Sequence, residues 1–216
     1  ALDDMAQQPA IKLTYFPIPG RAAAIRQAFF IGSIDFEDHT IPFEEFGRLK
    51  AAGVLPLGSV PILSINDEDP IPQSNALLRF AAKKAGIYPS DDLEALKVDS
   101  LMDTLEEAVA ALGPSMKMPD GAEKLAFRKN WWDTKANHAL TYVDKVAGAN
   151  KASAFAVGAS LSPADLLVAN VFQWFSSGTV DGITAEMLAP FVNIKRVADA
   201  TMAHEKVAEY HASQKK

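Results

Sequence analysis

A tyrosine and an arginine lie six residues apart near the N-terminus, in the stretch KLTYFPIPGRAAAIRQAFFIG (12–32). The alternating polarity of residues 10–15 predicts a strand that ends at Tyr15, and Arg21 opens a predicted amphipathic helix. Open α/β sheets bind ligands at the carboxyl ends of their strands, where a tyrosine hydroxyl can donate a hydrogen bond while its ring stays packed. Taken alone, the pair also fits a half-buried strand aromatic and a solvated helix arginine.

Two later motifs have the chemistry to hold a peptide-like or carboxylate ligand. In SVPI (59–62), Pro61 cannot donate to a sheet ladder, and a cis Val60–Pro61 bond would turn the backbone of Val60 outward toward a peptide-like ligand. QSNA (73–76) opens a predicted helix with an amide, a hydroxyl and backbone N–H groups at the positive end of the helix dipole. This motif suits a carboxylate, although a plain N-cap also explains it.

An acidic face is predicted on the first helix of the C-terminal half. Four carboxylates in VDSLMDTLEE (98–107) fall at i, i+4, i+7 and i+8, namely Asp99, Asp103, Glu106 and Glu107. This pattern fits a solvated stripe or half of a dimer contact.

The sequence predicts no metal site. The four histidines, at positions 39, 138, 204 and 211, show no metal-ligand spacing, and the chain has no cysteine. Any sulfur chemistry therefore needs a sulfur that arrives with a ligand.

The elements that must position these residues fall into two parts. Strands are expected at 10–15, 34–41, 59–65 and 71–72, and helices at 20–31, 43–53 and 73–86, in the order β-α-β-α-β-β-α. The second and third of these helices end at Gly53 and Gly86. On the helix over 73–86 we expect Ala76, Leu77, Phe80 and Ala81 to face inward.

After a linker at 87–92, only helices are predicted, over about 92–118, 121–148, 162–176 and 190–211. The third of these begins with a well-defined signal in LSPADLL, with Ser162 as N-cap, Pro163 at the first position and Asp165 completing a capping box. Leu161 and Leu166 flank it as a hydrophobic staple. Trp131, Trp132 and Trp174 are expected in the core or at an interface.

Composition excludes several classes of protein. With 216 residues, 49% of them apolar and 22% charged, the chain is typical of a globular protein of one or two domains. A net charge of −6 argues against a nucleic-acid partner. The sequence has no apolar run long enough for a membrane span, and its polar N-terminus does not fit a signal peptide.

Three N-terminal motifs, in this order and spacing, resemble a known family. KLTYFPIPGRA, GSVPIL and PQSNALLRFAAKKAG are similar to the thioredoxin-like domain of cytosolic glutathione transferases, and the strand-end tyrosine resembles their sigma class. The resemblance extends over nearly the whole chain, including the capping motif LSPADL. It implies a thioredoxin-like glutathione-binding domain (1–88) and an all-helical domain (89–216) with the electrophile pocket and dimer contacts.

The resemblance implies roles for the residues around the reacting sulfur. Tyr15 corresponds to the tyrosine that hydrogen-bonds the sulfur of glutathione, and Arg21 to an arginine close to it. Glutathione is then the co-substrate, with no metal required. A small apolar electrophile would lie in a pocket between the domains, against Phe16 and Val109.

The peptide part of glutathione has its own set of corresponding residues. Val60 matches the residue whose backbone pairs with the cysteinyl part, ahead of a cis-proline at Pro61. Gln73 and Ser74 match the pair that holds the γ-glutamyl carboxylate.

Near the glycyl end of glutathione the chain departs from the sigma pattern. Phe46 and Lys50 stand where that pattern has a tryptophan and a lysine, so an indole N–H is lost and only packing remains at Phe46. Ser59 replaces a more usual glutamine or lysine, and two extra residues around AAGVLPLG change the spacing. These departures bear on the affinity for glutathione.

The resemblance also implies a cytoplasmic homodimer. Glu107 lies where the family uses an acidic residue to reach the α-amino group of glutathione across the dimer interface. Glu106 lies where some sigma relatives place an acidic residue near a divalent cation.

Three functions remain open from the sequence. The first is transfer of glutathione to an electrophile, and the second is glutathione-dependent isomerisation of a prostaglandin-like endoperoxide. The third is a non-catalytic structural protein, as in lens crystallins. Tyr15, Arg21, Gln73 and Ser74 favour an enzyme, whereas the changes at Phe46 and Ser59 weigh mildly against one.

Overall fold

The computed structural model describes residues 9–214, which form two compact units that meet between Ala85 and Gly86. The expectation about a signal peptide rests mainly on residues 1–8, which lie outside the described residues. The first unit contains β1 (Ile11–Tyr15), η1 (Gly20–Ala22), α1 (Ala23–Ile31), β2 (Glu37–Thr40), α2 (Phe43–Ala51), β3 (Ile62–Ile65), β4 (Ile71–Pro72) and α3 (Ser74–Lys84). This order confirms the predicted β-α-β-α-β-β-α arrangement.

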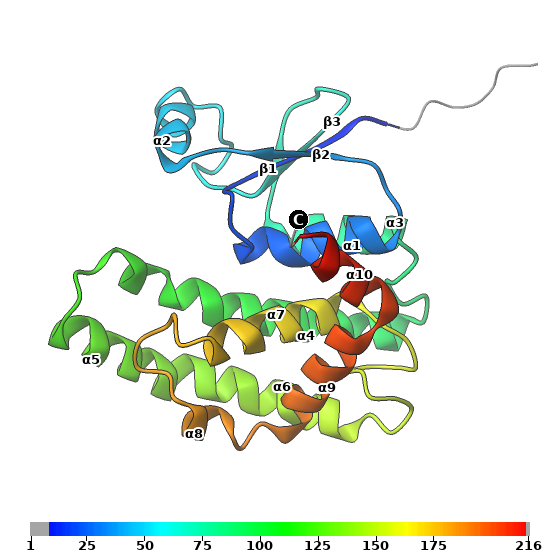
Figure 1. Ribbon diagram of the computed structural model, residues 1–216, viewed down its shortest axis with the longest axis vertical. Coiled ribbons are helices and arrows are strands. Elements are labelled where there is room, and N and C mark those ends of the chain that lie inside the picture. Colours follow the sequence, from blue (N-terminus) through cyan, green and yellow to red (C-terminus); the bar gives the residue numbers. More distant parts are fainter. Residues whose placement is uncertain (1–8, 215–216) are drawn as a thin grey trace, which may run out of the picture. The chain divides into compact units, whose positions relative to one another are not determined.

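The first unit is built on a sheet with strand order β2-β1-β3-β4, in which β1 runs parallel to β2 and antiparallel to β3. Helices α1 and α3 lie together on one face of this sheet, and α2 lies beside it (Figure 1). Leu13 of β1 and Ile25, Ala28 and Phe29 of α1 are completely buried. Strand β1 has a neighbouring strand on each side, so Tyr15 lies at the carboxyl end of an inner strand of the sheet.

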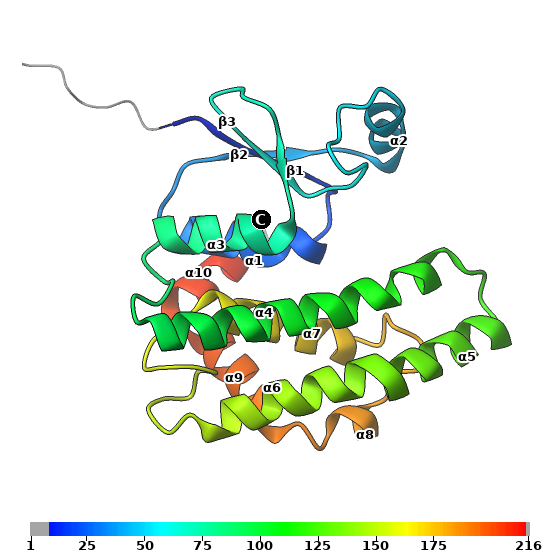
Figure 2. The same ribbon diagram turned by 180° about the vertical axis from the view of Figure 1, so that it is seen from behind.

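The second unit is a helical bundle made of α4 (Asp92–Leu112), η2 (Gly113–Lys117), α5 (Ala122–Trp131), the π-helical segment η3 (Trp132–Ala136), α6 (Asn137–Ala149), α7 (Pro163–Ser176), α8 (Ala185–Leu188), α9 (Val192–Ala203) and α10 (Glu205–Ser213). It has no strand within residues 86–214, as predicted. Helix α4 runs alongside the long α5–η3–α6 helix (Figure 2). Trp131 is buried, and its indole N–H donates to the carbonyl of Ala108 at 2.8 Å, which confirms a core role.

The predicted capping motif at the start of α7 is confirmed. Asp165 is fully buried and accepts hydrogen bonds from the backbone N–H and hydroxyl of Ser162, at 2.8 and 2.7 Å, and from the N–H of Ala156 at 2.7 Å. Leu161 and Leu166 are buried beside it, as expected for a staple. Burial raises the pKa of the Asp165 carboxyl to about 6, against the opposing effect of these hydrogen bonds.

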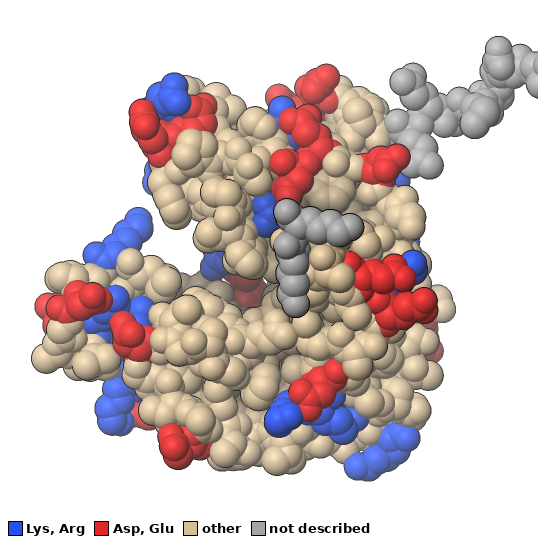
Figure 3. Space-filling view, viewed as in Figure 1, with Lys and Arg blue, Asp and Glu red and all other residues tan. Residues whose placement is uncertain are grey.

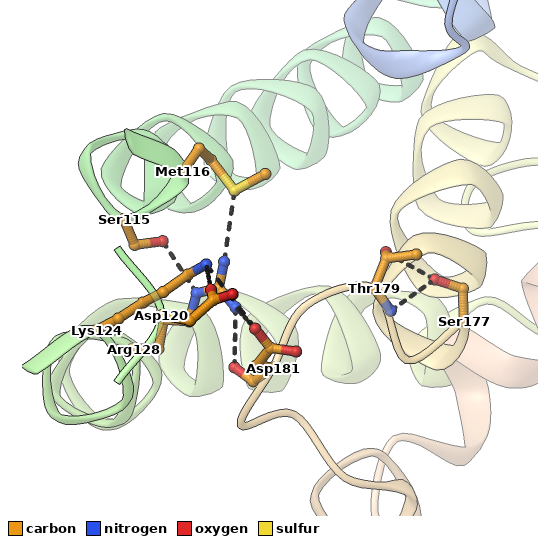
Figure 4. Close-up of polar contacts among 8 residues, drawn as sticks. All are labelled: Ser115, Met116, Asp120, Lys124, Arg128, Ser177, Thr179 and Asp181. Carbon is orange, nitrogen blue, oxygen red and sulfur yellow. Dashed lines mark hydrogen bonds and ion pairs between the residues drawn. The ribbon is translucent and has the colours of Figure 1, made fainter. Parts of the chain in front are cut away.

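A second polar cluster joins three segments of the helical unit (Figure 4). The buried Arg128 of α5 donates to the hydroxyl of Ser115 at 3.1 Å, and to the backbone carbonyl and carboxylate of Asp181, each at 3.2 Å. Its guanidinium also lies 3.7 Å from the sulfur of Met116. These contacts hold η2, α5 and the loop before α8 together, so the bundle satisfies its buried cation internally.

Several element predictions are wrong in detail. The strand expected over 34–41 is shorter and covers Glu37–Thr40. The strand expected from residue 59 begins at Ile62, since Pro61 has no N–H to donate to the ladder. The helix expected over 190–211 breaks at His204, whose ψ is 129°. A continuous helix would place Glu205 on the buried face, whereas the break lets Val207 be buried instead. Helix α8 (Ala185–Leu188) lies between the helices predicted over 162–176 and 190–211 and was not predicted.

The inward face expected for α3 is also corrected. Leu77 and Ala81 are buried as predicted, but Leu78 and Ala82 complete that face. Ala76 is exposed, and Phe80 is half-buried with the ammonium of Lys84 5.4 Å from its ring centre. The buried stripe is thus displaced by one residue from the predicted one, a rotation of about 100° around the helix axis.

Charged side chains of both signs are interspersed on the face shown in Figure 3, for example over α2, and form no basic stripe there. This distribution agrees with the acidic composition.

None of the helices within residues 9–214 is long and apolar enough to cross a membrane.

Candidate functional site

Tyr15 is fixed at the end of β1 by its backbone, its ring and its hydroxyl. Its ring is 6% exposed, and its carbonyl accepts the N–H of Ile41 at 2.8 Å. Its hydroxyl oxygen accepts the backbone N–H of Arg21 at 3.1 Å. Because the oxygen is already an acceptor, the hydroxyl proton is left to donate to another group.

The turn that brings Arg21 to the tyrosine requires glycine at position 20. Gly20 has φ +42°, and a Cβ atom there would lie 2.5 Å from the hydroxyl oxygen of Tyr15. The prediction from the sequence did not single out Gly20. Its signal was the Pro19–Gly20 pair immediately before the helix.

A second arginine holds the loop between β1 and α1. Arg26 is 7% exposed, and its guanidinium pairs with the carboxylate of Asp38 on β2, with Nε 2.9 Å from Oδ2. It also donates to the carbonyls of Ile18 and Phe16, at 2.8 and 3.3 Å. Arg21, whose side chain is exposed, was predicted as a site residue from the sequence, whereas the buried Arg26 was not, because its neighbours in the helix are mostly apolar.

Phe16 joins Tyr15 to helix α2 through aromatic contacts. Its ring centre lies 5.3 Å from that of Tyr15, 4.4 Å from that of Phe43 and 5.3 Å from that of Phe46. Phe46 meets Phe16 edge to face and is half-buried. Lys50, farther along α2, is exposed, with its side-chain stem beside Gly58.

The two motifs for the peptide part of a ligand adopt specific backbone geometry. The Val60–Pro61 bond is cis, and Val60 is buried just before β3. Gln73 precedes α3 with φ +83°, and Ser74 is the first residue of the helix. The side chain of Gln73 makes no capping hydrogen bond at this helix end, whose first N–H groups have the polarity that suits a carboxylate.

Glu107 and Val109 belong to α4 in the second unit. The carboxylate of Glu107 pairs with the ammonium of Lys135 at 2.9 Å, and both side chains are exposed. Val109 is half-buried. On the same face of α4, the carboxylate of Asp99 accepts the hydroxyl of Tyr88 at 2.9 Å. On the acidic face, Glu107 is thus paired with a lysine and Asp99 accepts a hydroxyl, and neither partner was predicted from the sequence.

A groove of about 410 Å³ runs between α4 and the η3–α6 helix, with Glu107 and Lys135 in its lining. Its other polar side chains are mainly hydroxyls, from Ser100, Thr104, Thr134 and Tyr142, together with His138. Tyr15 is not among the residues that line this groove. Within residues 9–214, no group of three or more His, Asp or Glu side chains is arranged to hold a metal ion.

Comparison with known proteins identifies the family. Residues 106–214, half of the chain, match the family described as glutathione S-transferase, C-terminal domain. The chain is 32% identical to probable glutathione S-transferase 8 of Caenorhabditis elegans over 167 residues, which is 73% of this chain and 76% of that protein. The chain belongs to the glutathione S-transferase family.

Other relatives of this glutathione transferase have different names. It is 28% identical to S-crystallin SL11 of Nototodarus sloanii over 94% of this chain and 95% of that protein. It is 29% identical to hematopoietic prostaglandin D synthase of Gallus gallus, also over 94% of this chain and 95% of that protein. The solved structure of a monomeric glutathione S-transferase from the hookworm Necator americanus is 25% identical, with a TM-score of 0.77 over 94% of this chain and 97% of that one. The fold class and the enzyme class expected from the sequence are confirmed.

Proposed function

We propose that this glutathione transferase is of the sigma type, and that the hydroxyl of Tyr15 donates a hydrogen bond to the thiolate of glutathione. The observation that carries the proposal is the contact between the N–H of Arg21 and the hydroxyl oxygen of Tyr15, at 3.1 Å. Since that oxygen accepts one hydrogen bond, its proton is directed to a different partner, and the accepted bond strengthens the hydroxyl as a donor.

The energy required of this hydrogen bond is modest. A free thiol has a pKa of about 8.5, so bringing it to about 7 requires roughly 2 kcal/mol of preference for the thiolate. A charge-assisted hydrogen bond contributes about 1.5–3 kcal/mol. The exposed side chain of Arg21, at the start of η1, is proposed to add positive potential near the same sulfur.

We propose that the rest of glutathione lies along the edge of the first unit. The backbone of Val60 would pair with the cysteinyl part, with Pro61 fixing the turn that follows. Ser74 and Gln73 would hold the γ-glutamyl carboxylate, a role supported by their place at the N-terminus of α3. Phe46 and Lys50 would contact the glycyl end, Phe46 by packing alone.

The proposal has two further parts, the electrophile and the assembly. Phe16, beside Tyr15, and Val109 of α4 are proposed contacts for a small apolar electrophile. We further propose a cytoplasmic homodimer in which Glu107 serves the glutathione bound by the partner, in keeping with a chain that has no cysteine. Glu107 would then share its carboxylate between Lys135 and the ligand.

A turnover assay tests the catalytic proposal. Purified enzyme is mixed with glutathione and, in separate reactions, with an aromatic halide, an enal, an isothiocyanate and a hydroperoxide. We expect consumption of glutathione above the uncatalysed rate with at least one of them, and loss of that activity in Tyr15→Phe. A wild-type rate equal to the buffer rate for the whole panel contradicts the proposal.

A second candidate is isomerisation of a prostaglandin-like endoperoxide that uses glutathione without consuming it. The observation that favours it is the 29% identity to a prostaglandin D synthase over 94% of the chain. The same assay, run with an endoperoxide as an additional substrate, separates the two reactions, because isomerisation yields a rearranged product while the glutathione concentration stays constant. If neither reaction occurs, a non-catalytic role is the remaining candidate, which the 28% identity to an S-crystallin over 94% of the chain supports.

A further inference from the structure

We infer that Phe43 contacts the electrophile and sets specificity, because it extends the aromatic surface beside Tyr15 into a stacking platform for flat, electron-poor aryl groups. The inference rests on the proposed function. No role for Phe43 was predicted from the sequence, and Phe43 is not among the residues proposed above to contact glutathione or the electrophile.

Phe43 is the first residue of α2. Figure 1 labels this helix. Its ring stacks on that of Phe16, with centres 4.4 Å apart and planes 26° apart. Phe16 in turn contacts the ring of Tyr15, with centres 5.3 Å apart. A continuous row of three rings thus leads from the proposed sulfur-binding hydroxyl to Phe43.

The exposure of Phe43 does not fit a purely structural role. Its side chain is 68% exposed, the highest value among the exposed large apolar residues within 9–214. Helix α2 has no buried residue, and Phe46, one turn farther along, is half-buried against the same Phe16 ring. Phe46 is therefore the better anchor for α2, while most of the Phe43 ring surface remains open to a ligand.

The chemistry of the open ring face selects the occupant. The face of a phenyl ring carries negative charge density, so it stacks best on a ring whose own density is withdrawn, such as a nitro-substituted aryl halide. In the reaction, the thiolate of glutathione forms a C–S bond at the carbon that bears the halogen. The halide leaves with the electron pair of the broken bond, and the thiol proton passes to solvent.

Selectivity between two electrophiles tests this inference. The value of kcat/KM is measured for a dinitrophenyl halide and for a short aliphatic enal, in the wild type and in Phe43→Leu, which keeps apolar volume but removes the ring. The ratio of the aryl value to the enal value should fall about 3- to 10-fold, the range that one aromatic pair supplies. Phe43→Trp should hold or raise that ratio.

Leu57→Ala is the matched control, since Leu57 is also an exposed apolar residue of the first unit and has no place in the row of rings. It should leave the ratio as in the wild type. The melting temperature and sedimentation of each variant show whether a loss reflects unfolding or altered assembly.

Each other outcome overturns the inference. Equal loss with both electrophiles makes Phe43 an anchor of α2, and an unchanged ratio removes it from the electrophile site. A shift from dimer to monomer in Phe43→Leu makes it a subunit contact. If the wild type turns over neither electrophile, the proposed function fails and this inference with it, whereas a turning-over wild type with an unchanged ratio rejects the inference alone.

Discussion

At the level of single residues, the hydroxyl of Tyr15 is oriented by the backbone rather than by another side chain. The N–H of Arg21 occupies one acceptor position of its oxygen. A backbone donor is held by the helix that it begins, so the direction of the hydroxyl proton depends little on side-chain motion. A hydrogen-bond donor that is already oriented in this way is what an enzyme needs to stabilise a thiolate.

We expect Tyr15→Phe to lower kcat by about one to three orders of magnitude, because removal of one preorganised donor has effects of that size. The dissociation constant for glutathione should change little, since the hydroxyl serves the sulfur and not the carboxylates of the peptide. Steady-state kinetics and calorimetric titration measure the two quantities. Tyr142→Phe, which removes the hydroxyl that pairs with Ser100 in the second unit, is the matched control. Wild-type kcat in Tyr15→Phe would end the assignment.

Gly20→Ala should lower turnover without removing any catalytic group. The added Cβ would lie 2.5 Å from the hydroxyl oxygen of Tyr15, so that hydroxyl must move away from the N–H of Arg21. We expect kcat/KM to fall at least tenfold, because a displacement of a catalytic group by about 1 Å can lower the rate of an enzyme by about 100-fold.

Gly53→Ala controls for backbone strain in this experiment. Gly53 also has a positive φ, of +70°, but a Cβ there has no neighbour within 4 Å. Both variants should lose a similar amount of stability from the left-handed backbone, on the order of 1 kcal/mol. If Gly53→Ala reduces turnover as much as Gly20→Ala does, the contact with Tyr15 is not the cause.

At the level of elements, the start of α7 combines a capping box with a buried carboxyl group. Burial raises the pKa of Asp165 from 3.8 to about 6 in the folded state. Between these two pH values the folded chain holds a proton that the unfolded chain has released. The stabilisation from this group is therefore complete below about pH 4 and is lost as the pH rises through about 6.

We expect the pH dependence of stability to differ between the wild type and Asp165→Asn. As the pH rises from 4 to 7, the free energy of unfolding of the wild type should fall relative to that of the variant by about 3 kcal/mol. Urea unfolding at several pH values measures the difference. Asp91→Asn is the control, because Asp91 caps α4 with an exposed carboxylate that accepts the N–H groups of Leu93 and Glu94. A constant difference across this pH range would mean that Asp165 is ionised throughout.

Elements with strong local signals were predictable from the sequence. The strand at Tyr15, the helix ends at Gly53 and Gly86, and the cap at Ser162 depend on residues close together in the chain, and each was found as expected. No proline or glycine marks the break at His204 in the sequence. The break depends on which residue the bundle buries, and it buries Val207 in place of Glu205. Local patterns carry no information on that choice.

The candidate site shows the same division between local and distant information. Residue types and motif spacing selected Tyr15 and Arg21, but the contact made by Arg21 through its backbone was not visible in them. Lys135 was missed as the partner of Glu107 because 28 residues separate them in the chain. Its pairing depends on the packing of α4 against the η3–α6 helix.

At the level of the whole molecule, the ion pair between Glu107 and Lys135 bears on assembly. Both side chains are exposed, by 72% and 50%, so the pair itself adds little to stability. A homodimer with a two-fold axis would let each subunit give and receive the same contact. In the proposed dimer, the α-amino group of glutathione competes with Lys135 for the carboxylate of Glu107.

This competition predicts opposite effects from the two members of one ion pair. Glu107→Gln should weaken glutathione binding about fivefold, because the α-amino group of the bound glutathione loses its negatively charged partner. Lys135→Met should tighten binding, since it releases Glu107 to the ligand. A pair that is only structural would lose the same interaction in either variant, and binding would change in one direction or not at all. Calorimetric titration measures affinity, and sedimentation should show a dimer for all three proteins. A monomer with normal activity, as the monomeric hookworm relative allows, would refute the shared site.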